Sequence, residues 1–386
     1  MEVKKRKKIL IDFEESFNSY TGIPLSTVND ALCIINSEFD VILWYSDKMK
    51  TPRIESWMEE YLSKEQRSRV VLLPNRPKNS IMWFAPLIPR PFRKAIDTDY
   101  AYSRLFPYLP IQGNKICVLR IDDPFGVSKS WLKTFANEVV SGAGLKNAVA
   151  KSLRTFAYSM MNHGNTIKIF NSRYTRNLWY SVYGHESDFD QVIYPPVQFS
   201  IEDFVFGEKK VEKVVNQRAY FVIIGGQRQR KDPLSIIRVW ASNLTQSDFD
   251  LFVVGKVDKK DFTQPISKAL NESRLIFKQN ISSLELRSLI QHSRGVIFNS
   301  KGEGFGNPIA EGIYLGVPVI CNSLDVFKEV GGKDALYYDN EDYESALKLM
   351  QLLSSYKDRS VKTSSQQYAM QHAINQWYKA LNYHLN

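Results

Sequence analysis

The sequence contains 386 residues, of which 44% are hydrophobic, and a chain of this size can build two domains with substantial cores. Its apolar runs are far shorter than the roughly 20 residues of a membrane-spanning helix, and the basic residues 4–8 precede only a short apolar run, so neither a spanning segment nor a secretory signal is expected. The few histidines and the three isolated cysteines argue against a zinc site and favour reduced, buried cysteines.

The formal net charge of +10 indicates an anionic partner. Nucleic acid is not expected, because the sequence has no nucleic-acid-binding motif and no basic-aromatic repeat. An anionic membrane surface that contacts residues 4–8 is one alternative, and anionic nucleotide or lipid-diphosphate substrates are another. The third alternative is that residues 4–8 form a solvated tail before the first strand.

The first half of the chain predicts a parallel α/β sheet. Short apolar runs at residues 9–12, 41–45 and 70–73 indicate buried strands, and residues 25–36 predict a helix. Gly22 follows the first strand at its carboxyl end, where open α/β sheets bind ligands, although a plain tight turn would also explain a glycine there.

Residues 81–110 are apolar, aromatic and interrupted by prolines, so they cannot form a long helix. We interpret them as a long connection that packs onto the sheet. The alternative is an acceptor-side or membrane-facing loop built around Trp83, Phe84 and Phe92.

Polar residues follow two further strands of this half. Residues 116–119 predict a strand that leads to Asp122 and Asp123, which either face a ligand or cap the following turn. Residues 166–170 predict another strand, followed by a helix. The paired prolines within residues 192–197 stiffen the chain and indicate a domain boundary.

The second half opens with a strand at residues 219–224 and a glycine pair that ends at Gly226. Arg228, Arg230 and Lys231 then precede an amphipathic helix. A glycine turn followed by clustered cations at a helix start suits a diphosphate. The turn lacks the GxGxxG fingerprint, so nicotinamide binding is not favoured.

The strongest pattern lies in residues 295–320, where a buried strand is followed by a glycine loop and Pro308 opens a helix. The free amides of a first helical turn favour an anion. Glu303 in the loop and Glu311, expected in the first helical turn, would repel a diphosphate, so both are expected to accept hydrogen bonds from sugar hydroxyls. The alternative is that Glu311 complements the helix dipole and Glu303 is a solvated loop residue.

The remaining predicted elements are strands at residues 251–254, 275–277, 319–321 and 336–339, and helices at residues 283–291, 309–315, 343–353 and 366–385.

The string Glu303-Gly-Phe-Gly-x-Pro-x-x-Glu311, followed by Gly316-Val-Pro-Val-Ile, resembles the Glu-x7-Glu signature of retaining glycosyltransferases of family four (glycosyl transferases group 1). The resemblance is strong over residues 166–340 and weak over the first 165 residues. It implies the α/β fold called GT-B, in which two Rossmann-like domains face a deep interdomain cleft.

The resemblance also implies the domain limits. Residues 1–197 are expected to form an acceptor-side domain, joined by a C-terminal helix at about residues 366–386 that crosses back onto it. Residues 198–365 are expected to form the nucleotide-sugar donor domain.

In the family, the first glutamate lies by the donor sugar and the second holds the ribose hydroxyls of the nucleotide. These roles fall on Glu303 and Glu311. The backbone amides of Phe305, Gly306 and Asn307 would bind sugar and phosphate, although Asn307 stands where the family often has Leu.

Two cations bind the donor diphosphate in the family, and Lys231 matches one of them. The usual arginine position is occupied by Gly226, so Arg228 or Arg230 would substitute, and we prefer Arg228. Many relatives have His at the position of Asp122, so Asp122 either takes a sugar or acceptor contact or is structural. The predicted catalytic residues are then Glu303, Lys231, Arg228 and Asp122, and the predicted donor-binding residues are Gly22, Gly226, Arg230, Gly304, Phe305, Gly306, Asn307 and Glu311.

The resemblance implies an enzyme that moves a hexose with retention from a UDP- or GDP-sugar to a glycan or lipid-linked glycan acceptor, as in bacterial O-antigen or capsule assembly. No cofactor and no essential metal are expected, because the cations and a helix N-terminus would stabilise the leaving diphosphate. The protein is expected in the cytoplasm, with peripheral attachment to the inner membrane face as an alternative. A GT-B-fold sugar-nucleotide epimerase and a non-enzymatic basic binding protein are the competing interpretations, and the donor sugar, the base, the acceptor, the linkage and the oligomeric state stay open.

Overall fold

The chain divides into two compact units, Met1–Pro195 with Gln371–Asn386, and Pro196–Met370. Each unit is described by itself. The computed structural model describes residues 6–13, 23–46, 51–77, 94–104, 111–112, 116–122, 149, 152, 155, 158, 166–184, 186–208, 210–212, 216, 218–226, 230–355 and 365–382.

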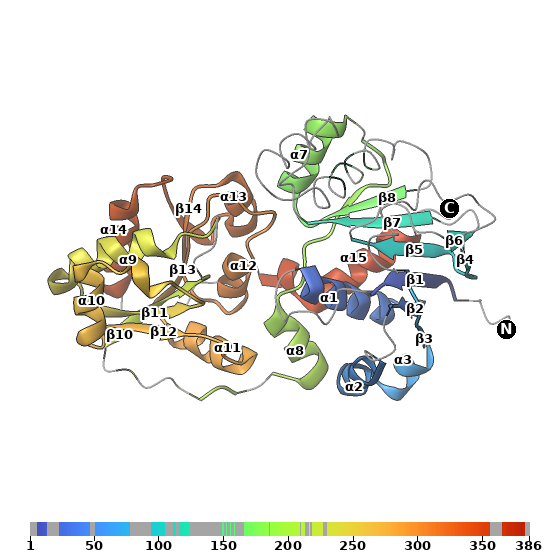
Figure 1. Cartoon of the computed structure of the whole chain (residues 1–386), viewed down its shortest axis with the longest axis horizontal. Coiled ribbons are helices and arrows are strands. Elements are labelled where there is room, and N and C mark those ends of the chain that lie inside the picture. The colour runs from blue at the N-terminus through green and yellow to red at the C-terminus, as the bar shows by residue number, and fades with distance from the viewer. Residues whose placement is uncertain are drawn as a thin grey trace. The chain divides into compact units, whose positions relative to one another are not determined.

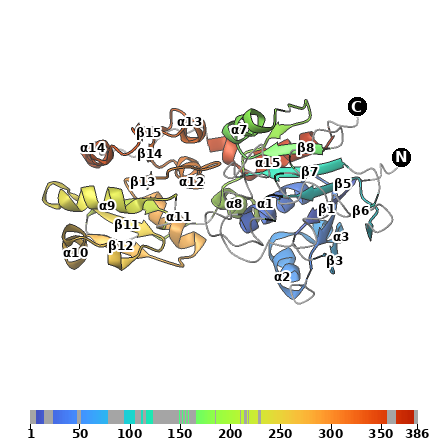
Figure 2. The ribbon, with the colours of Figure 1, turned by 45° about the horizontal axis from the view of Figure 1, so that its top comes forward.

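The first unit is built on a seven-stranded parallel sheet (Figure 1, Figure 2). Its strand order is β3-β2-β1-β5-β7-β8-β9, so the chain leaves the first strand to one side and later returns to the other. The strands are β1 (Lys8–Asp12), β2 (Asp40–Trp44), β3 (Val70–Leu73), β5 (Tyr100–Ser103), β7 (Ile116–Ile121), β8 (Thr166–Phe170) and β9 (Gln191–Val192), and β4 (Lys94–Ala95) pairs separately with β6 (Ile111–Gln112). The helices are α1 (Ile23–Asn36), α2 (Thr51–Tyr61), α3 (Lys64–Ser68), α7 (Arg173–Tyr183) and α15 (Met370–Asn382).

Helices α1 and α15 cover the same face of this sheet. The hydroxyl of Ser37, just after α1, donates to the carbonyl of Ile374 in α15 at 3.0 Å. From β5, the ring of Tyr102 lies edge-on to Trp377 of α15, with centroids 5.8 Å apart. The C-terminal helix is therefore part of the first unit.

The interpretation of residues 81–110 as a long connection is wrong for residues 100–103. These residues form β5, which pairs with both β1 and β7 at the centre of the sheet. Two tyrosines can be buried there because the hydroxyl of Tyr100 donates to the carbonyl of Leu381 and that of Tyr102 to Asp30. The aromatic residues proposed for a membrane-facing loop, Trp83, Phe84 and Phe92, lie outside the described residues.

The second unit has a six-stranded parallel sheet in the order β12-β11-β10-β13-β14-β15. Counted along the chain this is 3-2-1-4-5-6, the order of Rossmann folds, so the predicted α/β fold with two Rossmann-like sheets is confirmed. The strands are β10 (Ala219–Ile224), β11 (Phe249–Val254), β12 (Leu275–Lys278), β13 (Gly295–Phe298), β14 (Val319–Asn322) and β15 (Ala335–Tyr338). The helices are α8 (Gln198–Phe206), α9 (Pro233–Ser242), α10 (Gln264–Asn271), α11 (Ser283–His292), α12 (Asn307–Tyr314), α13 (Asp325–Gly331) and α14 (Tyr343–Ser355), with short 3₁₀ turns at Leu244–Gln246, Lys259–Asp261 and Ser365–Tyr368.

Alternate residues of the central strand β10 face two different helical layers, as the two-residue period of a strand requires. Phe221 and Ile223 belong to the core shared with α9, α10 and α14, whereas Tyr220 and Val222 pack with Leu289 of α11. Figure 1 shows α9, α10 and α14 on one side of this sheet and α11, α12 and α13 on the other. Both faces are buried, which explains why the strands appear in the sequence as continuous apolar runs.

Two helix starts differ from the sequence-based expectation. Helix α12 begins at Asn307 with Gly306 as its N-cap, so Glu311 lies in the second helical turn and not in the first. The helix dipole stabilises a carboxylate only within the first turn. The alternative that Glu311 merely complements the helix dipole is therefore weakened. At the C-terminus, a 3₁₀ turn comes first and α15 begins at Met370.

None of the described helices is both long and apolar enough to cross a membrane. The three cysteines form no disulfide among the described residues; Cys33 and Cys321 are buried and Cys117 is partly buried.

The turns after β10 and β11 touch through their backbones. Gly225 and Gly255 have φ values of +128° and +137°, in the region that favours glycine. A Cβ atom at Gly255 would lie 2.3 Å from the amide nitrogen of Gly226, and one at Gly226 would lie 2.7 Å from the carbonyl oxygen of Lys256. Gly226, predicted to bind the donor, is therefore required by packing whether or not a ligand is present.

We expect Gly255→Ala to lower the free energy of unfolding by more than about 2 kcal/mol, because the new methyl group meets backbone that cannot move aside. Gly184→Ala is the control, since Gly184 has a φ of +73° but open space around it, and it should lose only about 1 kcal/mol. Urea unfolding of both variants measures the difference, and equal losses would contradict the packing argument.

Candidate functional site

The residues singled out in the second half of the sequence lie where β10 and β13 end, the point at which the strand order of the second sheet reverses. The segment after β10 pairs with the segment after β13. Lys231 forms an antiparallel bridge with Ser300, and the amide of Lys301 donates to the carbonyl of Arg230 at 2.8 Å. This pairing joins the predicted cation segment to the loop that carries Glu303.

The side chain of Lys231 has a defined path. Its ammonium group lies 5.1 Å from the ring centroid of Phe298, the last residue of β13. A Cβ atom at Gly225 would come within 3.0 Å of the Lys231 Cδ, so the glycine leaves room for the lysine stem. Lys231 is thereby held at the end of the sheet with its charge near Glu311.

Glu311 is a partly buried carboxyl group in the second turn of α12. Burial raises the pKa of Glu311 from 4.5 to about 7, and the positive charge of Lys231 lowers it in part. Glu311 is therefore close to half ionised near neutral pH. A ligand that donates hydrogen bonds to the carboxylate would stabilise its ionised form, which burial disfavours.

Glu303 lies in the loop between β13 and α12 and is partly buried. The hydroxyl of Ser300 donates to Oε1 of Glu303, with the two oxygens 3.1 Å apart. Glu303 is thus tied to the same residue that bridges to Lys231.

Two buried asparagines brace this region, and the sequence analysis assigned them no role. Asn299 donates to the carbonyl of Asp232 at 2.8 Å and accepts from the hydroxyl of Tyr338 at 2.9 Å. The side-chain amide of Asn322 bonds both the N–H and the carbonyl of Ser300, at 3.1 and 2.9 Å. Their position was a usable signal, because each asparagine directly follows a buried apolar run at the edge where ligands bind.

The glycine-rich loop has mixed roles. The ring of Phe305 is buried against Tyr368, with centroids 6.1 Å apart, so a ligand could use only the backbone of Phe305. Gly306 adopts a φ of +108° close to the ring of Phe327. Gly304 is buried, and Asn307, the first residue of α12, is exposed.

The structure thus brings together Lys231, Glu303, Glu311 and the loop of residues 304–307 within the second unit. Arg230 directly precedes Lys231, and Gly226 lies in the turn after β10. Gly22 and Arg228 lie outside the described residues, and Asp122 belongs to the first unit.

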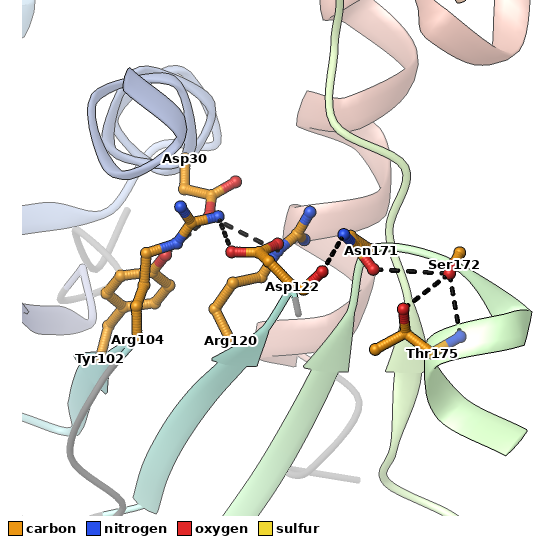
Figure 3. A network of polar contacts seen from close by, with 8 residues as sticks. All are labelled: Asp30, Tyr102, Arg104, Arg120, Asp122, Asn171, Ser172 and Thr175. Atoms are coloured by element: carbon orange, nitrogen blue, oxygen red, sulfur yellow. Dashed lines mark hydrogen bonds and ion pairs between the residues drawn. The ribbon is translucent and has the colours of Figure 1, made fainter. Parts of the chain in front are cut away.

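Asp122 is held by two buried arginines of the first unit (Figure 3). Its Oδ2 lies 2.5 Å from Nη2 of Arg104, and its Oδ1 accepts from Nε of Arg120 at 3.0 Å. The second carboxylate of the network, Asp30 of α1, accepts from the hydroxyl of Tyr102 at 2.6 Å and lies 3.5 Å from Arg104.

The charges in this network depend on one another. Burial by itself lowers the pKa of the Arg120 guanidinium, but the charges of Asp30 and Asp122 offset this and the net pKa is raised. The backbone carbonyl of Asp122 also accepts from the side chain of Asn171 at 2.7 Å. Both carboxylate oxygens of Asp122 are therefore occupied by arginines of its own unit, which favours the structural interpretation of this residue.

Within the described parts of the chain, no three His, Cys, Asp or Glu side chains group as metal ligands. Of the basic residues 4–8, the described members contact the first unit itself: Arg6 lies 3.9 Å from Glu65, Lys7 donates to Asn382, and Lys8 lies 3.4 Å from Asp97.

Asp122→Asn should destabilise the first unit by about 3 kcal/mol or more, because it leaves two buried arginines with one carboxylate. The control is Asp97→Asn, whose partner Lys8 is solvent-exposed, with an expected loss below about 0.5 kcal/mol. Chemical denaturation measures both. If Asp122→Asn kept full stability, the network would not be structural and a direct role in catalysis would be favoured.

Glu311→Gln should change how stability depends on pH. Since the pKa of Glu311 is raised from 4.5 to about 7, the folded state binds a proton more tightly than the unfolded chain between these values. Wild-type stability therefore falls as the pH rises through this window, and the variant should gain roughly 2–3 kcal/mol relative to wild type across it. Thermal unfolding at a series of pH values tests this, and a pH-independent difference would refute it.

The sequence of the second unit matches known proteins. Residues 206–369 match the family model of glycosyl transferases group 1. The serotype-specific mannosyltransferase WbdA of Escherichia coli is 34% identical over 126 residues, which are 31% of this chain and 15% of that protein. The O-antigen chain mannosyltransferase RfbU of Salmonella typhimurium is 30% identical over 179 residues, 44% of this chain and 47% of that protein. The match therefore spans less than half of either relative.

Solved structures resemble the whole chain. WaaG, a glycosyltransferase involved in lipopolysaccharide biosynthesis, matches with a TM-score of 0.58 and 14% identity, over 97% of this chain and 95% of that chain. Anabaena Alr3699/HepE in complex with UDP matches with a TM-score of 0.60 and 12% identity, over 98% and 100%. At such identities the likeness concerns the fold. The chain has the two-domain α/β fold of GT-B glycosyltransferases, and the part that holds Lys231, Glu303 and Glu311 matches the family model of glycosyl transferases group 1.

Proposed function

We propose that this protein is a retaining glycosyltransferase that moves a sugar from a nucleotide-diphosphate donor to an acceptor hydroxyl. One observation carries the proposal: Lys231, Glu303 and Glu311 gather at the switch point of the sheet in a glycosyl transferases group 1 domain. A cation there suits the diphosphate, and two carboxylates suit the hydroxyl groups of the sugar and the ribose.

Lys231 and the N-terminus of α12 would stabilise the charge that develops on the departing diphosphate. The stem of Lys231 is held between Gly225 and Phe298, so the ammonium group needs little reorganisation. The first turn of α12 adds the positive end of the helix dipole and the amide of Asn307, because Pro308 has no N–H and the amides of Ile309 and Ala310 donate to the carbonyl of Gly306. Arg228 or Arg230 would supply a second cation. With these charges in place, the proposal includes no essential metal and no cofactor.

Glu311 would accept hydrogen bonds from the two ribose hydroxyls of the nucleotide. Its raised pKa means that burial opposes the ionised form, and two hydroxyl donors would offset that penalty. Glu303 would accept from a hydroxyl of the donor sugar. Retention would follow from attack on the same face that the diphosphate leaves, guided by the departing phosphate.

The relatives favour a particular sugar and acceptor. Both matching curated relatives are mannosyltransferases, and RfbU acts on the O-antigen chain, so mannose and a surface polysaccharide acceptor are the preferred assignment. With a nucleotide-sugar donor and a growing or lipid-linked glycan acceptor, the reaction would take place in the cytoplasm, at the inner face of the membrane. The net charge of +10 would favour an anionic surface there.

The first test is thermal unfolding of the purified chain with UDP, GDP, dTDP or ADP and their common sugars, with and without EDTA. At a ligand concentration of about 100 times the dissociation constant, one nucleotide should stabilise the chain by roughly 2.7 kcal/mol, whether or not EDTA is present. Glu311→Ala should abolish this shift. Glu285→Ala should keep it, because Glu285 is a surface residue paired with Lys278.

Transfer is then measured with the nucleotide sugar that binds. The anomeric configuration of the product, read by NMR, should equal that of the donor. Inversion would exclude the retaining mechanism, and the absence of binding by every nucleotide would refute the proposed function as a whole.

A further inference from the structure

The side-chain hydroxyl of Ser300 lies at the centre of the candidate site. Three oxygen atoms surround its Oγ: Oε1 of Glu303 at 3.1 Å, the carbonyl oxygen of Arg230 at 3.2 Å and that of Gly302 at 3.2 Å. Ser300 is 1% exposed, so water does not compete for these contacts. One buried hydroxyl therefore links the cation segment to the loop of the acidic residue.

A serine hydroxyl has a single hydrogen and can donate to one of these acceptors at a time. A carboxylate is the strongest of the three, because a hydrogen bond to an ionised acceptor is about twice as strong as one between neutral groups. The carbonyl of Arg230 already accepts from the amide of Lys301. The hydrogen is accordingly directed at Glu303.

The backbone of Ser300 cannot turn to follow another partner. The amide of Asn322 holds both its N–H and its carbonyl, and the same Asn322 nitrogen lies 2.8 Å from Oδ1 of Asn340. Bridging to Lys231 fixes Ser300 from the other side. The position from which the hydroxyl donates is therefore set by the contacts of the Ser300 backbone at the end of the sheet.

Glu303 depends on this one contact. Among the described residues, the hydrogen bond from Ser300 to Oε1 is the bond that the Glu303 carboxylate makes, and Oε2 has no partner there. A carboxylate can accept through both oxygens, so a hydroxyl held at Oε1 leaves Oε2 able to accept from a ligand.

We propose that Ser300 is a positioning residue: its hydroxyl holds Oε1 of Glu303 so that Oε2 is presented to a hydroxyl group of the donor sugar, at a fixed place relative to Lys231. Ser300 acts through Glu303 on the binding of the donor sugar, whereas Glu311 binds the nucleotide. This inference rests on the proposed function and adds to it the residue that holds Glu303 in place.

The test uses isothermal titration of the full-length chain with UDP and GDP, and with UDP-glucose and GDP-mannose. The quantity of interest is the sugar increment, the ratio of the dissociation constant of the nucleotide to that of its sugar derivative. In Ser300→Ala, we expect the nucleotide to bind within about twofold of wild type and the sugar increment to fall about tenfold, since a hydrogen bond to a charged group is lost. The rate of sugar transfer at saturating donor should fall at least as much.

Two further variants separate positioning from mere stability. Ser293→Ala is the matched control, because Ser293 is equally buried in this unit and its hydroxyl donates to the carbonyl of Ile290, away from Glu303; its sugar increment should be unchanged. In a Glu303→Ala background, adding Ser300→Ala should have no further effect on the increment, as a double-mutant cycle requires when one residue acts through the other.

The outcomes are distinct. If the wild-type chain binds neither nucleotide nor sugar derivative, the proposed function fails and this inference falls with it. If the wild type shows a sugar increment that Ser300→Ala leaves intact, or if Ser300→Ala weakens nucleotide and sugar derivative equally, only the inference about Ser300 is overturned.

Discussion

The site of the second unit depends on the pairing between the segment after β10 and the segment after β13. The bridge between Lys231 and Ser300, with the bond from the Lys301 amide to the Arg230 carbonyl, holds together two stretches that are far apart in the chain. The strand order reverses between the neighbouring strands β10 and β13, and the polar segments that follow these two strands meet at their carboxyl ends. The cation, the two glutamates and the helix N-terminus owe their proximity to that one geometric fact.

Both units place charged residues at the carboxyl ends of their central strands, but they neutralise them differently. In the first unit, Asp30 and Asp122 balance Arg104 and Arg120, and the cluster is closed on itself. In the second unit, burial shifts the pKa of Glu311 to about 7 in spite of Lys231, so this group is not fully compensated by its own protein. A ligand can supply the hydrogen bonds that a partly compensated buried charge lacks. In a closed network of carboxylates and arginines, the charges already compensate one another and the removal of one partner is costly.

Glycines allow close backbone contacts around the site, and asparagines bond its backbone groups. Gly225, Gly226 and Gly255 let two turns touch through their backbones, and this contact leaves the path along which Lys231 runs. Beyond the end of the sheet, backbone groups no longer take part in the hydrogen bonds between strands. The side-chain amides of Asn299 and Asn322 bond such groups, in Asp232 and Ser300. The site is therefore rigid at its base although it is made of loops.

The sequence by itself determined much of the fold and indicated candidate site residues. Buried parallel strands are continuous apolar runs, which is a local property of the sequence, so most strands and the two Rossmann-like halves could be predicted. The spacing from Glu303 to Glu311, with Pro308 between them, indicated the loop and the helix that follows it. Only the tertiary structure decided that residues 100–103 form a central strand, because the hydroxyls of Tyr100 and Tyr102 find their partners in α15 and α1. It also decided that Asp122 is enclosed by Arg104 and Arg120, that Ser300 holds Glu303, and that Glu311 titrates near neutral pH. The physical reason is the same in each case. Hydrophobic periodicity is a property of the local sequence, whereas the partner of a buried polar group belongs to another strand or helix and comes within reach only once the chain has folded.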